Sequence, residues 1–204
     1  MLYEFENEIG ELTTTVIADY TFLPSKARRI QIPGLGDTAP NFVVNQAEAL
    51  FQHLDTDEIQ PISLHSLLAE RPLVLSFFDP EWSASYAELS LAVLERAYSK
   101  IRALGGELVV LTPVPVLSLG NLIRKADVSF PIFQDTGKVI AAKYGIYSLR
   151  YPAYQRISGI EKDVLLPATF VISQNKKIIH FTVDEKFDNP FITRELLTAV
   201  YSVK

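Results

Sequence analysis

Short apolar runs alternate with amphipathic stretches along most of the chain. The runs LVLSFF (73–78) and ELVVLTP (107–113) have the length and composition of buried strands. Between them, the segment from Ser85 to Leu104 carries apolar residues at helical spacing. Two parallel strands joined by a helix form a βαβ unit. The pattern therefore predicts an α/β core that begins near residue 73.

The second half of the chain predicts smaller elements and a hairpin. Helices are predicted at 117–127, 138–146 and 190–203, and a small strand at 130–135. The strands PATFVIS (167–173) and KIIHFTVD (177–184) are separated by QNK, which is short enough for an antiparallel hairpin. In the turn between them, Asn175 is expected to supply the positive φ that such a turn needs. Helices flanking a central mixed sheet in this order predict a thioredoxin-like α/β fold.

Residues 1–35 are predicted to be an N-terminal β extension. The stretch TTTVIADYTFLPS is rich in β-branched residues, and IPGLGD (32–37) is a segment rich in Gly and Pro that we expect to separate this extension from the next unit. Residues 36–204 then form the thioredoxin-like domain. Early in that domain the sequence predicts a strand at 39–44, an inserted amphipathic helix at 46–54 and a short helix at 63–70.

Charge and hydropathy exclude several classes of partner. The net charge of −5 and the scattered Lys and Arg residues argue against a nucleic-acid-binding surface, which needs clustered positive charge. No apolar run reaches the roughly 18 residues of a membrane span. Glu4, Glu6, Glu8 and Glu11 are incompatible with the basic start of a signal peptide, so we expect a cytoplasmic protein.

The absence of cysteine removes every thiol from the chain. Disulfides, thiolate metal sites and thiol nucleophiles are excluded. The three histidines, His53, His65 and His180, are far apart in sequence and match no metal-ligand spacing. We therefore expect no metal and no cofactor. Asp79 and Glu81 flank a predicted strand-to-helix turn, and we expect them to be solvated turn carboxylates.

Five stretches, in order, resemble the peroxiredoxin-like family of alkyl hydroperoxide reductases and thiol-specific antioxidants (AhpC/TSA, redoxin), within the thioredoxin superfamily. The stretches are APNFVV, RPLVLSFFDPEW, LGGELVVLTP, FPIFQDTGKVIAAKYGI and LPATFVI. The resemblance covers about residues 36–202 and implies a thioredoxin-like fold. It also implies a family activity, thiol-dependent peroxide reduction, whose nucleophile is a cysteine in the first turn of the helix after the first core strand.

The window that resembles this active site is WSASY, residues 82–86. Alignment on Trp82 puts Ser83 and Tyr86 at the two cysteine positions of the family, whereas alignment on the following Glu-Leu pair puts Ser85 at the second position. Under both alignments the nucleophile is not sulfur. A serine hydroxyl stays protonated at neutral pH unless a general base lies beside it, and the window contains no histidine.

A proline replaces a second functional residue of the family. Peroxiredoxins carry an arginine just before the ATF strand, where this chain has Pro167. Proline there resembles thioredoxin-like relatives, in which a cis-proline faces the active-site turn, so we predict a cis Leu166–Pro167 bond. We assign Trp82, Pro167 and Thr169 to a binding surface beside the turn.

The sequence leads to a hypothesis of binding without peroxidase chemistry. We expect a binding or assembly module that uses the former active-site face for an unidentified protein or peptide partner, with a homodimer as a further option. Two enzymatic alternatives remain: a thiol oxidoreductase whose native cysteine stands as serine in this sequence, and an enzyme that binds glutathione through the hydroxyl of Ser83 or Tyr86.

Overall fold

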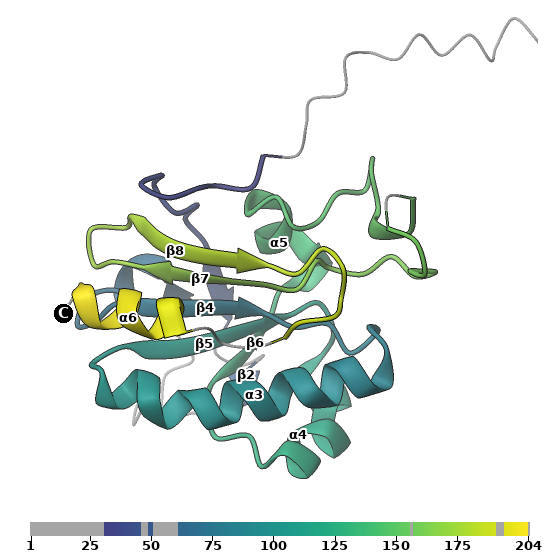
Figure 1. Ribbon diagram of the computed structural model, residues 1–204, viewed down its shortest axis with the longest axis horizontal. Helices are drawn as coiled ribbons and strands as arrows, with labels where there is room; N and C mark the ends of the chain where they lie inside the picture. The colour runs from purple at the N-terminus through teal and green to yellow at the C-terminus, as the bar shows by residue number, and fades with distance from the viewer. Residues whose placement is uncertain (1–30, 46–48, 51–60, 156, 191–193, 204) are drawn as a thin grey trace, which may run out of the picture.

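A six-stranded mixed sheet organises the computed structural model, which describes residues 31–45, 49–50, 61–155, 157–190 and 194–203 (Figure 1). The strands in spatial order are β2 (Ala49–Leu50), β6 (Ile132–Gln134), β5 (Glu107–Thr112), β4 (Leu73–Phe77), β7 (Ala168–Ile172) and β8 (Ile178–Val183). Strands β4, β5 and β6 are parallel, and β7 and β8 form the predicted antiparallel hairpin. A separate antiparallel pair joins β1 (Val43–Asn45) to β3 (Pro61–Ser63).

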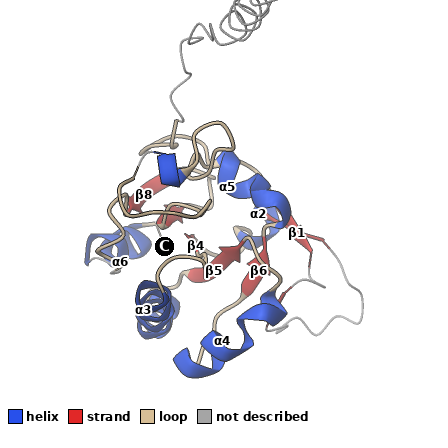
Figure 2. Ribbon diagram, turned by 90° about the vertical axis from the view of Figure 1, so that its right-hand side faces the viewer, coloured by secondary structure: helices blue, strands red, loops and turns tan. Residues whose placement is uncertain are grey.

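Helices cover both faces of the sheet (Figure 2). The helices are α2 (Leu64–Leu67), α3 (Ala84–Ala103), α4 (Gly120–Ala126), α5 (Val139–Lys143) and α6 (Arg194–Ser202), with 3-10 turns η2 (Val116–Leu119), η3 (Thr136–Lys138) and η4 (Ala153–Gln155). Apolar residues of α2 and α5 pack on one face, and those of α3, α4 and α6 pack on the other. The thioredoxin-like α/β fold predicted from the sequence is confirmed.

The alternation along β4 shows why its sequence is apolar throughout. Leu73, Leu75 and Phe77 point into the core beneath α2 and α5, whereas Val74 points into the core beneath α3. Since β4 is the strand between β5 and β7, all five of its residues are buried. Its carboxyl end runs directly into the turn before α3, where the candidate site lies.

The segment 31–38 lies against the far edge of the sheet. The Gly36 amide donates to the Ile178 carbonyl (2.8 Å), and the Ile178 amide donates to the Asp37 carbonyl (3.0 Å). Gly145 has a positive φ, and a Cβ there would lie 2.6 Å from the Gln31 carbonyl oxygen. Glycine is therefore required where this segment crosses the end of α5. The β extension predicted for residues 1–35 falls almost wholly outside the described residues, and its boundary stays a prediction.

Two local predictions from the sequence are wrong. The helix predicted at 46–54 is wrong at Ala49 and Leu50, which form strand β2, and its other residues lie outside the described part. Strand β6 would otherwise leave its edge unpaired, so this tertiary pairing overrides the helical pattern. In the β7–β8 turn, the positive φ falls on Lys176 and not on Asn175, because the Lys176 amide closes the turn onto the Ser173 carbonyl.

The prediction of a cis Leu166–Pro167 bond is also wrong. Among the described residues no peptide bond is cis. The Leu166 amide donates to the Ile146 carbonyl (3.0 Å), and the Pro167 carbonyl accepts from the Asp184 amide (2.9 Å). The backbone on both sides of this peptide bond is therefore extended and leads into β7. A trans proline directly before the strand removes no hydrogen-bond donor from the sheet.

Candidate functional site

The turn between β4 and α3 presents its two serines to solvent. Ser83 is the N-cap of α3, and its hydroxyl accepts a hydrogen bond from the Tyr86 amide at 3.3 Å. Ser83 and Ser85 are exposed, and their hydroxyl oxygens are 3.4 Å apart. An N-cap hydroxyl satisfies a helix amide that would otherwise lack an acceptor. Ser83, one of the three positions that the family resemblance links to a thiol, therefore has a structural role here.

Trp82 is the buried centre of this turn. Only 5% of its surface is exposed, and its indole Nε1 donates to the Leu165 carbonyl at 2.8 Å. Its ring makes edge contacts with Phe78, Tyr86 and Phe187, at centroid distances of 5.5, 5.3 and 6.3 Å. Trp82 thus joins the turn to the segment before Pro167 and to the loop before α6.

The side chain of Asp79 also binds the segment before Pro167, a contact that the sequence did not predict. Its side chain is buried; Oδ2 accepts from the Leu165 amide (3.1 Å) and Oδ1 from the Glu81 amide (3.0 Å). Burial raises the pKa of Asp79, and these two hydrogen bonds only partly oppose that effect. The expectation of a solvated carboxylate is wrong for Asp79, whereas Glu81 is exposed and pairs with Lys162. Together Asp79 and Trp82 hold both the amide and the carbonyl of Leu165.

Tyr86 turns inward and binds a carboxylate at the end of β8. Its hydroxyl donates to Asp184 Oδ2 at 2.7 Å, and burial together with this bond raises the pKa of Tyr86 well above its usual value. Burial also acts to raise the pKa of Asp184, but hydrogen bonds from Tyr86 and from the backbone amides of 186, 188 and 189 outweigh it, so the net shift is downward. The pair therefore consists of a neutral phenol and a carboxylate anion at neutral pH.

Pro167 and Thr169 complete the set of predicted site residues. Pro167 is buried directly before β7. The Thr169 hydroxyl lies 2.9 Å from the Ser76 hydroxyl on β4, the residue directly opposite it. The predicted surface residues Trp82, Pro167 and Thr169 therefore lie together.

A cavity of about 570 Å³ connects these residues. It lies between α3, the ends of β7 and β8, and the loop 184–190. Of the predicted residues, Trp82, Tyr86, Pro167 and Thr169 line it, whereas Ser83 and Ser85 do not. The structure thus divides the predicted site into an exposed serine turn and an adjacent cavity.

Nothing in the described part of the chain supplies a base or a metal to the serines. No hydrogen bond there joins Ser83 or Ser85 to a histidine; His65 lies on α2, His180 lies on β8, and His53 is outside the described residues. No group of three or more His, Asp or Glu residues in that part could hold a metal ion. None of its helices is long and apolar enough to cross a membrane.

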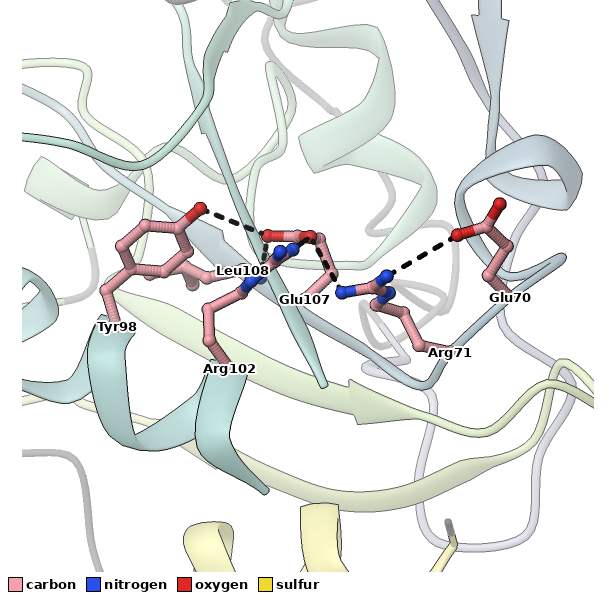
Figure 3. Close-up of polar contacts among 6 residues, drawn as sticks. All are labelled: Glu70, Arg71, Tyr98, Arg102, Glu107 and Leu108. Carbon is pink, nitrogen blue, oxygen red and sulfur yellow. Dashed lines mark hydrogen bonds and ion pairs between the residues drawn. The ribbon is translucent and has the colours of Figure 1, made fainter. Parts of the chain in front are cut away.

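A second polar cluster lies at the opposite end of the sheet and is internally paired (Figure 3). Glu107 accepts from Arg102 and from the Tyr98 hydroxyl (3.4 Å), and Arg71 lies 3.8 Å away. Arg71 also pairs with the exposed Glu70. Because two carboxylates balance two guanidinium groups, this cluster has no excess charge to attract a ligand and serves to tie β5 to α3.

Solved structures with this architecture are thioredoxin-like proteins. The peroxidoxin BcpB of Mycobacterium tuberculosis aligns with a TM-score of 0.60 at 17% identity, over 84% of this chain and 99% of that one. A peroxiredoxin-like protein from Aquifex aeolicus gives 0.63 at 14% identity, over 85% and 90%. A putative thiol:disulfide interchange protein DsbE from Chlorobium tepidum gives 0.56 at 15% identity, over 84% and 98%.

The sequence narrows this class to one family. The AhpC/TSA family model matches residues 35–181, so the chain belongs to the AhpC/TSA family. A search of curated protein sequences returned no match. The chain therefore belongs to a peroxiredoxin-type oxidoreductase family, but the chain itself contains no cysteine.

Substituting Tyr86 with phenylalanine is expected to lower the free energy of unfolding by about 1 kcal/mol at pH 7, because Asp184 loses one charge-assisted hydrogen bond but stays partly solvated. Since the folded-state pKa of Asp184 is depressed, this stabilisation is present above its unfolded pKa and is lost as pH falls through the folded value. Urea unfolding at pH 7 and pH 3 measures both effects, with the exposed Tyr201→Phe as control. An equal loss at both pH values would contradict the assignment.

Proposed function

We propose that this protein is a non-peroxidatic member of the AhpC/TSA family that binds a protein or peptide partner at the face formed by Trp82, Tyr86, Pro167 and Thr169. The observation that carries the proposal is the use of Ser83 as a helix cap, beside a cavity of about 570 Å³ lined by those four residues. Cavities of about 300–1,000 Å³ are typical of ligand sites.

The chemistry of the turn supports the absence of peroxidase activity. A helix N-terminus stabilises a nearby negative charge by about 0.3–1 kcal/mol, far too little to ionise a serine hydroxyl at neutral pH. The hydroxyl of Tyr86, the other candidate position, already donates to Asp184. A hydroxyl that donates to a carboxylate and is buried is a poor nucleophile and a poor donor to glutathione.

A peroxide-consumption assay with a thiol reductant tests the proposal. The unmodified chain is expected to consume hydrogen peroxide no faster than buffer. Ser83→Cys and Ser85→Cys are expected to carry reactive thiols, because both positions are exposed at the start of α3, where the helix lowers a thiol pKa. Tyr86→Cys is expected to react slowly, since only 6% of the residue is exposed.

The matched control is Ser202→Cys, an exposed serine at the opposite, carboxyl end of a helix, α6. Iodoacetamide at pH 7 should label Ser83→Cys and Ser85→Cys several-fold faster than this control. Peroxide turnover by the unmodified chain would overturn the proposed function. Comparing this sequence with its genomic coding sequence tests separately whether a serine has replaced a native cysteine.

A further inference from the structure

Three hydroxyl side chains form a row across adjacent strands beneath α3. Ser76 on β4 is directly opposite Thr169 on β7, which in turn is directly opposite Thr182 on β8. All three line the cavity described above. The neighbouring residues on this face of β4 and β7, Val74 and Val171, are fully buried and apolar, so the row is a polar strip in an apolar face.

The row can donate a hydrogen bond into the cavity. Ser76 and Thr169 are 4% and 8% exposed, and their oxygens share one hydrogen bond. That bond uses one of the two hydroxyl hydrogens, and both residues line the cavity. A carbonyl oxygen entering the cavity would accept the other hydrogen.

The loop after β8 makes the mouth of the same cavity acidic. Asp184, Glu185 and Asp188 line it, and Lys186 is the one basic residue among the described lining residues. Glu185 and Asp188 are exposed, and Asp184 is kept ionised by its hydrogen bonds. The mouth therefore carries three carboxylates against one ammonium group, which favours a cationic ligand and disfavours glutathione, itself an anion.

The edge of the sheet beside the cavity suits an extended chain. Among the described strands β8 is the last of the sheet, and the described segment 36–37 pairs only with its first residue, Ile178. The Asp184 amide bonds inward to the Pro167 carbonyl, so the antiparallel alternation turns the backbone groups of Phe181 and Val183 outward. Both residues also line the cavity. An edge of this kind can add a peptide strand.

We infer that the ligand of this face is a basic, extended peptide segment, which places one carbonyl against the Ser76–Thr169 pair and a Lys or Arg side chain beside Glu185 and Asp188. This inference rests on the proposed function and specifies its partner. The peptide backbone supplies the acceptor, the basic side chain matches the acidic mouth, and the edge of β8 aligns the chain. The net charge of −5 favours the same class of partner at long range.

Titration with defined peptides tests this inference. Trp82 lines the cavity and is the single tryptophan of the chain, so its fluorescence reports binding there. The probes are acetylated, amidated Ala-Lys-Ala-Lys-Ala and its Gln and Glu counterparts, with free lysine as a small-amine control. The lysine peptide is expected to bind at least ten-fold more tightly than each of the others, and its affinity should fall as salt is raised from 50 to 500 mM.

Variants separate the contribution of the Ser76–Thr169 hydroxyl pair to peptide binding from that of the acidic side chains. Ser76→Ala combined with Thr169→Val removes both hydroxyls at once, so neither is left unpaired, and is expected to weaken the lysine peptide about ten-fold with little change in the melting temperature. Glu185→Gln and Asp188→Asn should each weaken it several-fold, whereas Lys186→Gln should strengthen it. Glu70→Gln, an exposed carboxylate at the other end of the sheet, should leave it unchanged.

The outcomes distinguish this inference from the proposed function. Binding of the glutamine or glutamate peptide as tightly as the lysine peptide would overturn the basic class while leaving a peptide-binding face. An equal effect of Glu70→Gln and Asp188→Asn would reduce the interaction to overall charge and overturn the site. Absence of any peptide binding would also overturn it. The proposed lack of peroxidase activity is tested by the peroxide assay, which none of these results affects.

Discussion

Replacing Trp82 with alanine is expected to lower the free energy of unfolding by about 3–5 kcal/mol, the largest effect we predict for a single site residue. The indole is 5% exposed and contacts three aromatic rings, so its removal leaves a cavity between α3, β4 and the loop before α6. It also leaves the Leu165 carbonyl without its donor. Urea unfolding followed by far-ultraviolet circular dichroism measures the loss, since the variant has no tryptophan.

Trp82→Phe separates the packing of the ring from its hydrogen bond. Phenylalanine keeps an aromatic ring near Phe78 and Tyr86 but cannot donate to Leu165, so we expect a smaller loss of about 1–3 kcal/mol. The surface control is Tyr201→Ala, because Tyr201 is 64% exposed. If Trp82→Ala lost no more stability than Tyr201→Ala, the central position of Trp82 in this turn would be disproved.

Local sequence patterns predicted most of the fold because each main element buries its own apolar pattern. The all-apolar stretch 73–78 became a strand between two neighbours, and the helical stripe from Ser85 to Leu104 became α3. The turn residues between β7 and β8 set the hairpin. These features depend on residues within a few positions of one another, so a single sequence contains enough information to predict them.

The failed predictions depend on partners that are distant in sequence. Ala49 and Leu50 have a helical pattern but pair with β6, more than 80 residues further on. Asp79 is polar and sits in a turn, yet its acceptor oxygens meet the amide of Leu165, 86 residues away. A tertiary contact of this kind decides whether a carboxylate is buried. The position of Asp79 in a turn, taken alone, therefore led to the wrong expectation that it is solvated.

The sequence predicted where the candidate site lies, but it did not predict all the residues that line the cavity. The family resemblance placed it at the β4–α3 turn and at Pro167, and the cavity is lined by Trp82, Tyr86, Pro167 and Thr169. It missed Asp184, and it missed Ser76 and Thr182 on either side of the predicted Thr169, because these positions depend on the strand register. The sequence did contain one indication of this row of hydroxyl residues. Hydroxyl residues are unusual in strands that are otherwise apolar, and three such strands could have been aligned to bring these residues opposite one another.

Replacing Asp79 with alanine is expected to lower the free energy of unfolding by about 2–3 kcal/mol at pH 7, because the buried amide of Leu165 and the partly buried amide of Glu81 lose their acceptor. Asp79→Asn keeps one acceptor oxygen and should lose about 1–2 kcal/mol. Glu81→Gln is the neighbouring control, since Glu81 is exposed and its surface ion pair contributes little. Urea unfolding of the three variants gives this ranking directly.

The pH dependence tests the same contact by its sign. Burial raises the pKa of Asp79 above its unfolded value, so the folded state holds this proton more tightly, and ionisation of the group costs stability as pH rises through the folded pKa. Asp79→Asn cannot ionise and avoids that cost. The stability advantage of the native chain over Asp79→Asn should therefore be largest below about pH 4, where the unfolded state is also protonated, and should narrow toward pH 7. An advantage that instead widened with rising pH would mean that the two amides favour the carboxylate more than burial opposes it.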